Sequence, residues 1–334
     1  MKKIKLGIIG CGIAARELHL PALEKLSARF EITAVCNHTE KKAAEFSKLV
    51  GNVPYYLDYK DLLKDNNVDA VDITLPIELN YKTAVDSINA NKHVFLEKPL
   101  AANLKDAKRL VELSKNKNVV CYLAENYRQD ELYLEMKKLL ERKIIGNVYS
   151  VVWNVFNNLS LKNKYAQTKW RQNNKYPGGF VYDGGVHNIA ALRLLFGNFK
   201  SGYAIKKSIR KEIGTDDTFS LNYEFENGVN GVLNIYFSVN GIYKNELLIF
   251  GDKGTLITTN NVIEIYRENK NVKKITVETD GGFENEFKEF YDAVVKGKKF
   301  INTFEEGYND IKILLNAFKA AEKNEIINFS KDLH

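Results

Sequence analysis

The feature that most constrains the fold is a regular alternation of short apolar runs and amphipathic stretches over residues 1–124. The runs IKLGIIG, EITAVCN, VDAVDITLP, HVFLE and NVVCYLA have the length and composition of buried strands. The stretches between them, such as NYKTAVDSINAN and NLKDAKRLVELSKN, have helical periodicity. Strands separated by helices form βαβ units, so we predict an α/β fold whose first domain, residues 1–124, is a doubly wound parallel sheet.

From residue 125 onward the pattern changes. The helical stretch DELYLEMKKLLERK, closed by Gly146, precedes seven runs with strand character. DTFSLNYEF alternates apolar with polar residues from Phe219 to Phe225, which is typical of a half-buried antiparallel strand. The pairs Asn227-Gly228 and Asn240-Gly241 predict hairpin turns.

Two helical stretches, ENEFKEFYDAVVKG and EEGYNDIKILLNAFKAAEKN, follow these strands. We therefore predict a second domain over residues 125–334, of α+β type, with a large, mostly antiparallel, open-faced sheet. Helices cover one face of such a sheet, and the other face is available to a partner subunit. A homodimer or homotetramer is expected.

A glycine-containing turn, GIIGCGIAARELH, stands between the first strand and the first helix. Gly10 permits a tight turn, and Gly12 lets the backbone approach a pyrophosphate bound at a helix N-terminus. Ala15 occupies the place of the usual third glycine and is small enough for close packing of helix on strand. This setting predicts a Rossmann dinucleotide-binding domain rather than a plain α/β turn.

The end of the second strand bears on the choice of nicotinamide cofactor. A site that prefers NAD usually carries an acidic residue there, which binds the adenosine ribose. This chain has Asn37, His38 and Thr39 instead, followed by Lys41 and Lys42. No carboxylate at the strand end would repel a 2′-phosphate, so we predict NADP, with NAD as the alternative. The structural alternative is a solvated helix start with Thr39 as N-cap.

A lysine follows the strand HVFLE, at the carboxyl edge where α/β proteins bind ligands. Lys98, with Pro99 fixing the chain after it, would stabilise a substrate oxygen that gains negative charge. The alternative is a surface lysine at a strand end.

The stretch YPGGFVYDGGVHNIAALRLLFG carries an aspartate and a histidine on a helical pattern. Asp183 and His187 are four residues apart, so they share one face of a helix. Such a pair suits proton transfer, with the histidine as base and the aspartate orienting it. A capped helix with a buried histidine is the alternative.

Taken together, these features resemble the glucose–fructose oxidoreductase / inositol dehydrogenase (Gfo/Idh/MocA) family, from about Ile4 to Leu315. The resemblance rests on motifs in a fixed order: GCGIAA, Glu97-Lys98-Pro99, Trp170-Arg171, Pro177-Gly178-Gly179, Asp183-Gly184-Gly185-Val186-His187 and GDKGTL.

The resemblance implies an NAD(P)-dependent oxidoreductase that transfers hydride between nicotinamide and a hydroxyl or carbonyl carbon of a sugar, polyol or related small molecule. Lys98, Asp183 and His187 are its expected catalytic residues. The expected cofactor-binding residues are Gly10, Gly12, Ile13, Ala14, Asn37, His38, Thr39, Pro76, Asn80, Glu97, Lys98, Asn126, Trp170 and Arg171. No metal site is expected.

Two positions depart from the family pattern. Ala190 stands where many members have a second acid, three residues after the histidine, and Asn80 stands where a histidine is often found. Substrate recognition therefore does not transfer with the hydride chemistry. A non-catalytic dinucleotide-binding regulator of the same fold is the alternative function, although such a protein has no need for Lys98, Asp183 and His187 together.

Composition narrows the remaining classes. The 334 residues carry a net charge of +7, but the lysines are scattered and form no compact basic run of the kind that binds nucleic acid. Cys11, Cys36 and Cys121 lack metal-ligand spacing and are expected to be small buried strand residues in a reducing cytoplasm. In MKKIKLGIIGC, Lys5 interrupts the apolar run, so we expect a strand rather than a signal peptide, and no membrane helix.

Overall fold

The computed structural model describes residues 2–172, 176–210, 212, 216–268 and 270–330. The chain forms two compact units, of which the first comprises Met1–Gln129 and Gly282–Asn309, and the second comprises Asp130–Gly281 and Asp310–His334. The contiguous domains expected at 1–124 and 125–334 differ from this division chiefly because Gly282–Asn309 joins the first unit.

The first unit contains a six-stranded sheet in the order β3-β2-β1-β4-β5-β6, and every neighbouring pair is parallel. The predicted doubly wound sheet is thereby confirmed. Its strands are β1 (Ile4–Ile9), β2 (Phe30–Cys36), β3 (Tyr55–Tyr56), β4 (Ala70–Ile73), β5 (His93–Glu97) and β6 (Cys121–Ala124). Its helical segments are η1 (Ala15–His19), α1 (Leu20–Lys25), α2 (Glu40–Leu49), α3 (Tyr59–Leu63), α4 (Ile77–Asn89), α5 (Leu104–Lys115), η2 (Asn126–Arg128) and α9 (Phe283–Lys296).

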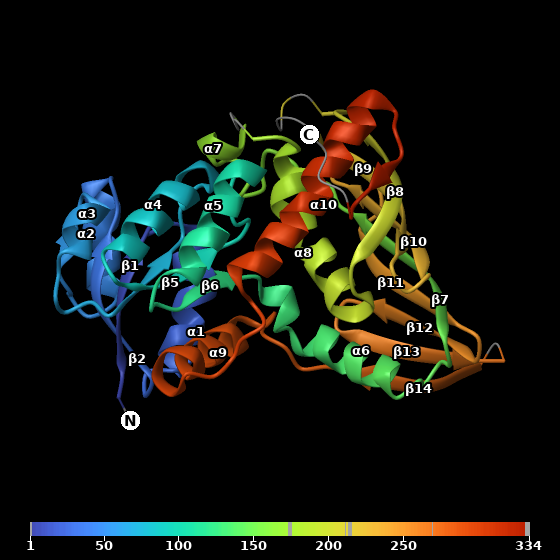
Figure 1. Ribbon diagram of the computed structural model, residues 1–334, viewed down its shortest axis with the longest axis horizontal. Coiled ribbons are helices and arrows are strands. Elements are labelled where there is room, and N and C mark those ends of the chain that lie inside the picture. Colours follow the sequence, from blue (N-terminus) through green and yellow to red (C-terminus); the bar gives the residue numbers. More distant parts are fainter. Residues whose placement is uncertain (1, 173–175, 211, 213–215, 269, 331–334) are drawn as a thin grey trace. The chain divides into compact units, whose positions relative to one another are not determined.

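An aromatic cluster explains why α9 belongs to this unit. Helices α1 and α9 lie side by side (Figure 1). On the sheet beneath them, Phe95 stacks on Phe287 of α9 with ring centroids 4.3 Å apart, and Tyr122 lies edge-on to Phe290. Helical periodicity predicts that this segment has an apolar face, but it does not say which sheet the face covers.

The second unit contains a nine-stranded sheet in the order β14-β13-β12-β11-β7-β10-β9-β8-β15. Neighbouring strands are antiparallel except for β7 and β10, which are parallel. The strands are β7 (Val148–Phe156), β8 (Phe199–Lys207), β9 (Thr218–Phe225), β10 (Asn230–Tyr236), β11 (Lys244–Gly251), β12 (Gly254–Thr259), β13 (Val262–Arg267), β14 (Lys270–Thr276) and β15 (Ile327–Asn328). The helices are α6 (Glu131–Glu141), α7 (Lys169–Gln172), α8 (Gly179–Phe196) and α10 (Phe304–Lys323), the last of which belongs to this unit from Asp310 onward.

The sheet confirms some sequence predictions and corrects others. Phe219 and its alternate neighbours through Phe225 are buried, as the period-two pattern predicts. Asn227-Gly228 joins β9 to β10 as a hairpin. The prediction of a hairpin at Asn240-Gly241 is wrong, because the strands on either side of it, β10 and β11, both pair with β7, which lies between them. Strand β12 was not predicted, because its apolar and polar residues alternate too weakly to indicate a strand.

One face of this sheet lies under α6, α8 and α10 (Figure 1). The opposite face carries a row of partly exposed apolar side chains, which we call the sheet row: Val232, Val152, Leu248 and Ile257, neighbours in register on four adjacent strands. Beside this row, Asn234 donates to Asn154 at 2.9 Å. The two kinds of side chain leave this face half apolar and half polar.

Two further expectations can be checked in the described residues. All three cysteines are free and buried, as expected. Cys36 and Cys121 lie on β2 and β6, but the expectation of a strand is wrong for Cys11, which lies in the turn after β1. Burial raises the pKa of the Cys11 thiol to about 11, which keeps it unreactive. Among the helices described, none is both long and apolar enough to span a membrane.

Candidate active site

The predicted dinucleotide turn follows β1 directly. Gly10 has φ +105°, and a Cβ there would lie 2.5 Å from the backbone oxygen of Thr74, so only glycine fits. A Cβ on Gly12 would meet no described atom within 4 Å, which is the open space that a pyrophosphate needs. Ile13 and Ala14 are partly exposed beside it. The turn therefore fits the phosphates of a dinucleotide.

Residues at the end of β2 brace the turn. The Asn37 side-chain oxygen accepts from the backbone N–H of Cys11 at 3.3 Å, and its amide donates to the backbone oxygen of Thr39 at 3.3 Å. Asn37 is 9% exposed, whereas His38 is exposed. Thr39 is the N-cap of α2. Asn37 thus has a supporting role that the sequence did not indicate.

Arg16 adds a cation near this strand end. Its guanidinium donates to the backbone oxygens of Cys11 at 3.2 Å and Lys42 at 3.4 Å, and it lies 5.0 Å from the centre of the Phe46 ring. Sequence reasoning missed this residue, although its place directly after the GCGIAA motif was a usable signal.

Lys98 is partly exposed and follows β5 at the carboxyl edge of the parallel sheet, joined to Pro99 by a cis peptide bond. Asn80 of α4 holds the backbone on both sides of it, because its amide donates to the backbone oxygens of Glu97 at 3.0 Å and Pro99 at 2.9 Å. Asn80 is 0% exposed, so the structure places this expected cofactor residue beneath the segment rather than at its surface.

Two further expected cofactor residues lie in the first unit. Pro76 is the partly exposed N-cap of α4, and Asn126 is a buried residue of η2.

Glu97, the last residue of β5, accepts from a histidine that the sequence analysis did not single out. The Nε2 atom of His19 lies 3.2 Å from Oε1 of Glu97, and its Nδ1 lies 2.9 Å from Oδ2 of Asp72 on β4. His19 reads in the sequence as an ordinary helix residue. Its role depends on the sheet order, which brings the ends of β4 and β5 together.

In the second unit, α8 carries Asp183 and His187 on one continuous helix, as predicted. Of the two glycines between them, Gly185 permits close packing, because a Cβ there would lie 2.9 Å from Cδ1 of Ile235 on the sheet. Asp183 is 8% exposed, and His187 is partly exposed. The helix thus presents the histidine at a more open position than the aspartate.

Asp183 has a partner that was expected at the cofactor instead. Nε of Arg171 on α7 donates to its carboxylate at 2.7 Å, and Nη1 of Arg171 donates to Thr168 at 3.2 Å. The Arg171 guanidinium also lies 4.0 Å from the centre of the Trp170 ring. Trp170 and Arg171 are therefore parts of one cluster with Asp183.

The three expected catalytic side chains are divided between the units, with Lys98 in the first and Asp183 and His187 in the second. That they form one centre stays a prediction.

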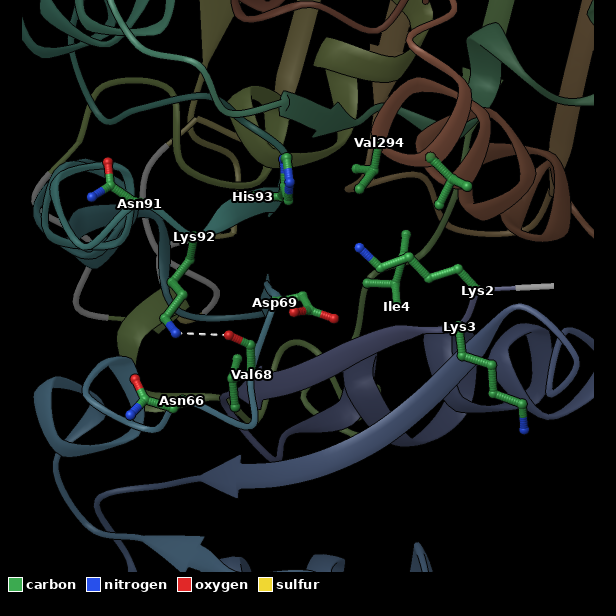
Figure 2. Close-up of a pocket in the computed structure, with 11 residues that line it drawn as sticks. Lys2, Lys3, Ile4, Asn66, Val68, Asp69, Asn91, Lys92, His93 and Val294 are labelled. Atoms are coloured by element: carbon green, nitrogen blue, oxygen red, sulfur yellow. Dashed lines mark hydrogen bonds between the residues drawn. The ribbon is translucent and has the colours of Figure 1, made fainter.

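A cavity of about 390 Å³ in the first unit lies at the amino-terminal edge of the parallel sheet (Figure 2), the edge opposite Lys98. Asp69, Lys92 and His93 line it. Within the described part of the chain, no group of three or more His, Cys, Asp or Glu side chains is arranged to hold a metal ion.

Comparison with known proteins agrees with this architecture. Residues 4–125 match the family model described as oxidoreductase family, NAD-binding Rossmann fold, and residues 137–329 match the model of the C-terminal alpha/beta domain of the same family. The two domains together define an NAD(P)-binding oxidoreductase. The chain belongs to the Gfo/Idh/MocA oxidoreductase family, as the sequence motifs predict.

Three relatives illustrate the range of the family. The crystal structure of an oxidoreductase from Thermotoga maritima is 36% identical, with a TM-score of 0.94 over 99% of this chain and 100% of that one. An uncharacterized protein of Saccharomyces cerevisiae is 30% identical over 97% of both chains. The scyllo-inositol 2-dehydrogenase (NADP(+)) of Bacillus subtilis is 28% identical over 66% of this chain and 60% of its own.

Proposed function

We propose that the protein is an NAD(P)-dependent dehydrogenase or reductase that acts on the CH–OH group, or the corresponding carbonyl, of a sugar, polyol or related small molecule. The observation that carries the proposal is the fixed position of Lys98, which Asn80 holds at the same sheet edge as the dinucleotide turn. The inositol dehydrogenase of Bacillus subtilis supports a polyhydroxylated substrate class.

The chain's own residues divide the work in oxidation as follows. His187 accepts the proton of the substrate hydroxyl, which makes loss of hydride from the same carbon favourable. Lys98 donates a hydrogen bond to that oxygen as it becomes a carbonyl. A bound nicotinamide supplies the hydride acceptor. In reduction, His187 and Lys98 act in reverse.

Asp183 has a supporting role in this scheme. Its carboxylate is fixed by the Arg171 guanidinium, one helical turn before His187. A fixed negative charge on the same helix face stabilises the imidazolium that forms when His187 takes the proton. Arg171, in turn, is held by Thr168 and packs on Trp170, so the charge does not move away from the helix.

The test compares wild type with His187→Asn and Lys98→Met in an assay of NADPH- and NADH-linked turnover on a panel of sugars and inositols. His187→Asn should lower kcat by roughly 10²–10⁴-fold through loss of the general base. Lys98→Met, which keeps the length of the side chain, should lower it by roughly 10² or more through loss of an oxyanion donor. Cofactor affinity, measured by fluorescence titration, should change little. Turnover near the wild-type value in both variants would refute the proposal.

We further propose that NADP is the preferred cofactor. Asn37 carries no charge, and the Arg16 guanidinium lies between the turn and the start of α2, beside Lys42. These groups favour a 2′-phosphate, which a carboxylate at the strand end would repel.

Cofactor choice is tested by titration with NADPH and NADH. Wild type should bind NADPH with the lower Kd. Asn37→Asp should weaken NADPH roughly tenfold relative to NADH, since one charge repulsion at close range is on the order of 1 kcal/mol or more. Equal Kd values for the two cofactors in wild type would contradict the preference.

A further inference from the structure

A histidine in the interior of the first unit has a carboxylate on each ring nitrogen. Nδ1 of His19 lies 3.0 Å and 2.9 Å from the two carboxylate oxygens of Asp72, and Nε2 lies 3.2 Å from Oε1 of Glu97. His19 and Asp72 are 0% exposed, and the Glu97 side chain is 12% exposed. We call these three residues the buried triad.

The arrangement fixes the charge of the ring. An ionised carboxylate only accepts hydrogen bonds, so with one at each nitrogen both nitrogens donate and the imidazole is a cation. Burial raises the pKa of Asp72, while the charge and hydrogen bond of His19 lower it and favour the ionised form. Burial by itself lowers the pKa of His19, but the charges and hydrogen bonds of Asp72 and Glu97 outweigh burial and hold that pKa well above its ordinary value. The edge-on rings of Phe95 and Phe287, with centroids 5.6 Å and 5.4 Å away, leave the ring little room to turn.

The triad joins two segments that the proposed function uses. His19 is the last residue of η1, the π-helical turn that follows the dinucleotide turn, and Glu97 immediately precedes Lys98. Asn80 fixes the backbone around Lys98, while His19 fixes the Glu97 side chain. We propose that His19 is a positioning residue, which holds Glu97 against the end of β5 and thereby sets the geometry of the neighbouring Lys98 and of the cofactor that binds beside it.

This inference rests on the proposed function. One further acidic residue, Glu286, interacts with the charge of His19. Glu286 of α9 is 0% exposed, and among the described residues neither of its carboxyl oxygens has a hydrogen-bond partner. Burial raises the pKa of Glu286 well above its usual value, and the charges of Glu97, Glu125 and Asp72 add to the effect against the opposing charge of His19. A protonated Glu286 carries no charge, so it does not compete with Asp72 and Glu97 for the His19 cation.

Two amide substitutions separate the two sides of the ring. The side-chain nitrogen of asparagine falls near the place of Nδ1, and that of glutamine falls near the place of Nε2. His19→Gln therefore keeps a donor for Glu97, whereas His19→Asn keeps one only for Asp72. If His19 acts through Glu97, His19→Asn should lower kcat roughly tenfold relative to His19→Gln. Glu97→Met removes the acceptor, so in that background the two histidine variants should have the same kcat.

His93→Gln is the matched control. His93 begins the same strand at its opposite end, lines the amino-terminal cavity (Figure 2), and accepts through Nδ1 from the backbone N–H of Val120 at 2.9 Å. Its substitution should leave kcat unchanged. Equal kcat in His19→Gln and His19→Asn, or a roughly tenfold difference between them that persists after Glu97→Met, would overturn the positioning role.

Two measurements decide the matter without turnover. The Kd for NADPH should rise roughly tenfold in His19→Asn but not in His19→Gln, a coupling of ordinary size between contacting residues. In wild type, ¹⁵N NMR of the histidines should show a ring, absent from the His19 variants, with both nitrogens protonated at pH 7.5. If every histidine ring of wild type is neutral at pH 7.5, the triad is overturned even if the variants do not fold. If wild type turns over nothing on the panel, the proposed function fails, and the Kd comparison alone then supports or refutes the role of His19.

Discussion

Each unit contains an aspartate paired with a cation, and the two pairs differ in how far they are enclosed. Asp72 and His19 are both 0% exposed, and Phe287 of α9 lies against the His19 ring. Asp183 and Arg171 have side chains that are 11% and 13% exposed, and His187, one turn along α8, is partly exposed. An enclosed pair cannot touch a substrate and can only set geometry and stability, whereas a pair near the surface can act on a molecule that arrives.

Removal of each aspartate in turn tests this difference most directly. Asp72→Ala should lower the free energy of unfolding by about 3–5 kcal/mol, because it leaves a buried cation short of its main partner. Asp183→Ala should cost less, because Arg171 is 13% exposed and keeps its hydrogen bond to Thr168, and its effect should fall on turnover instead. Urea denaturation of both variants measures the difference. Equal losses of stability would show that the two pairs are equivalent.

The two sheets also differ in how they are covered. Helices of the first unit cover the aromatic face of its sheet, whereas the sheet row of the second unit lies on the face away from α6, α8 and α10. The sheet row is the surface through which we propose that subunits associate as a dimer or tetramer. Leu248→Arg places a charge in the middle of that row and should convert the oligomer to a monomer without unfolding it. Light scattering at micromolar concentration checks the assembly. A monomeric wild type would contradict the proposal.

The smallest effect concerns Glu286. An acid whose pKa is raised on folding contributes stability below its unfolded value, here 4.5, and loses it as pH rises toward the folded value. Glu286→Gln does not titrate, so its Tm relative to wild type should increase from pH 5 to pH 8. A difference in Tm that does not change with pH would show that Glu286 ionises normally.

Local pattern predicted much of this molecule. The parallel sheet, the dinucleotide turn, the β9 alternation and the helix that carries Asp183 and His187 all follow from periodicity and turn residues over short windows. What could not be predicted depends on contacts between distant segments. The partners of Asp72 and Asp183 are 53 and 12 residues away along the chain, and no spacing rule links them. The Asn240-Gly241 turn failed for the same reason, because a turn motif does not reveal a third strand lying between its two neighbours.

Helix α9 belongs to the first unit although it follows the strands of the second sheet in the sequence, and this order has a consequence for synthesis. The aromatic face formed by Phe95 and Tyr122 is complete only when Phe287 and Phe290 have been made, so the N-terminal sheet leaves the ribosome long before its cover. Residues 130–281 of the second unit are synthesised during that interval, so most strands of its sheet can pair first. A nascent chain of this kind exposes an apolar, aggregation-prone surface for the time needed to add some 160 residues, about 8–30 s at ordinary elongation rates. The unit whose synthesis begins first is therefore not the first to be fully covered.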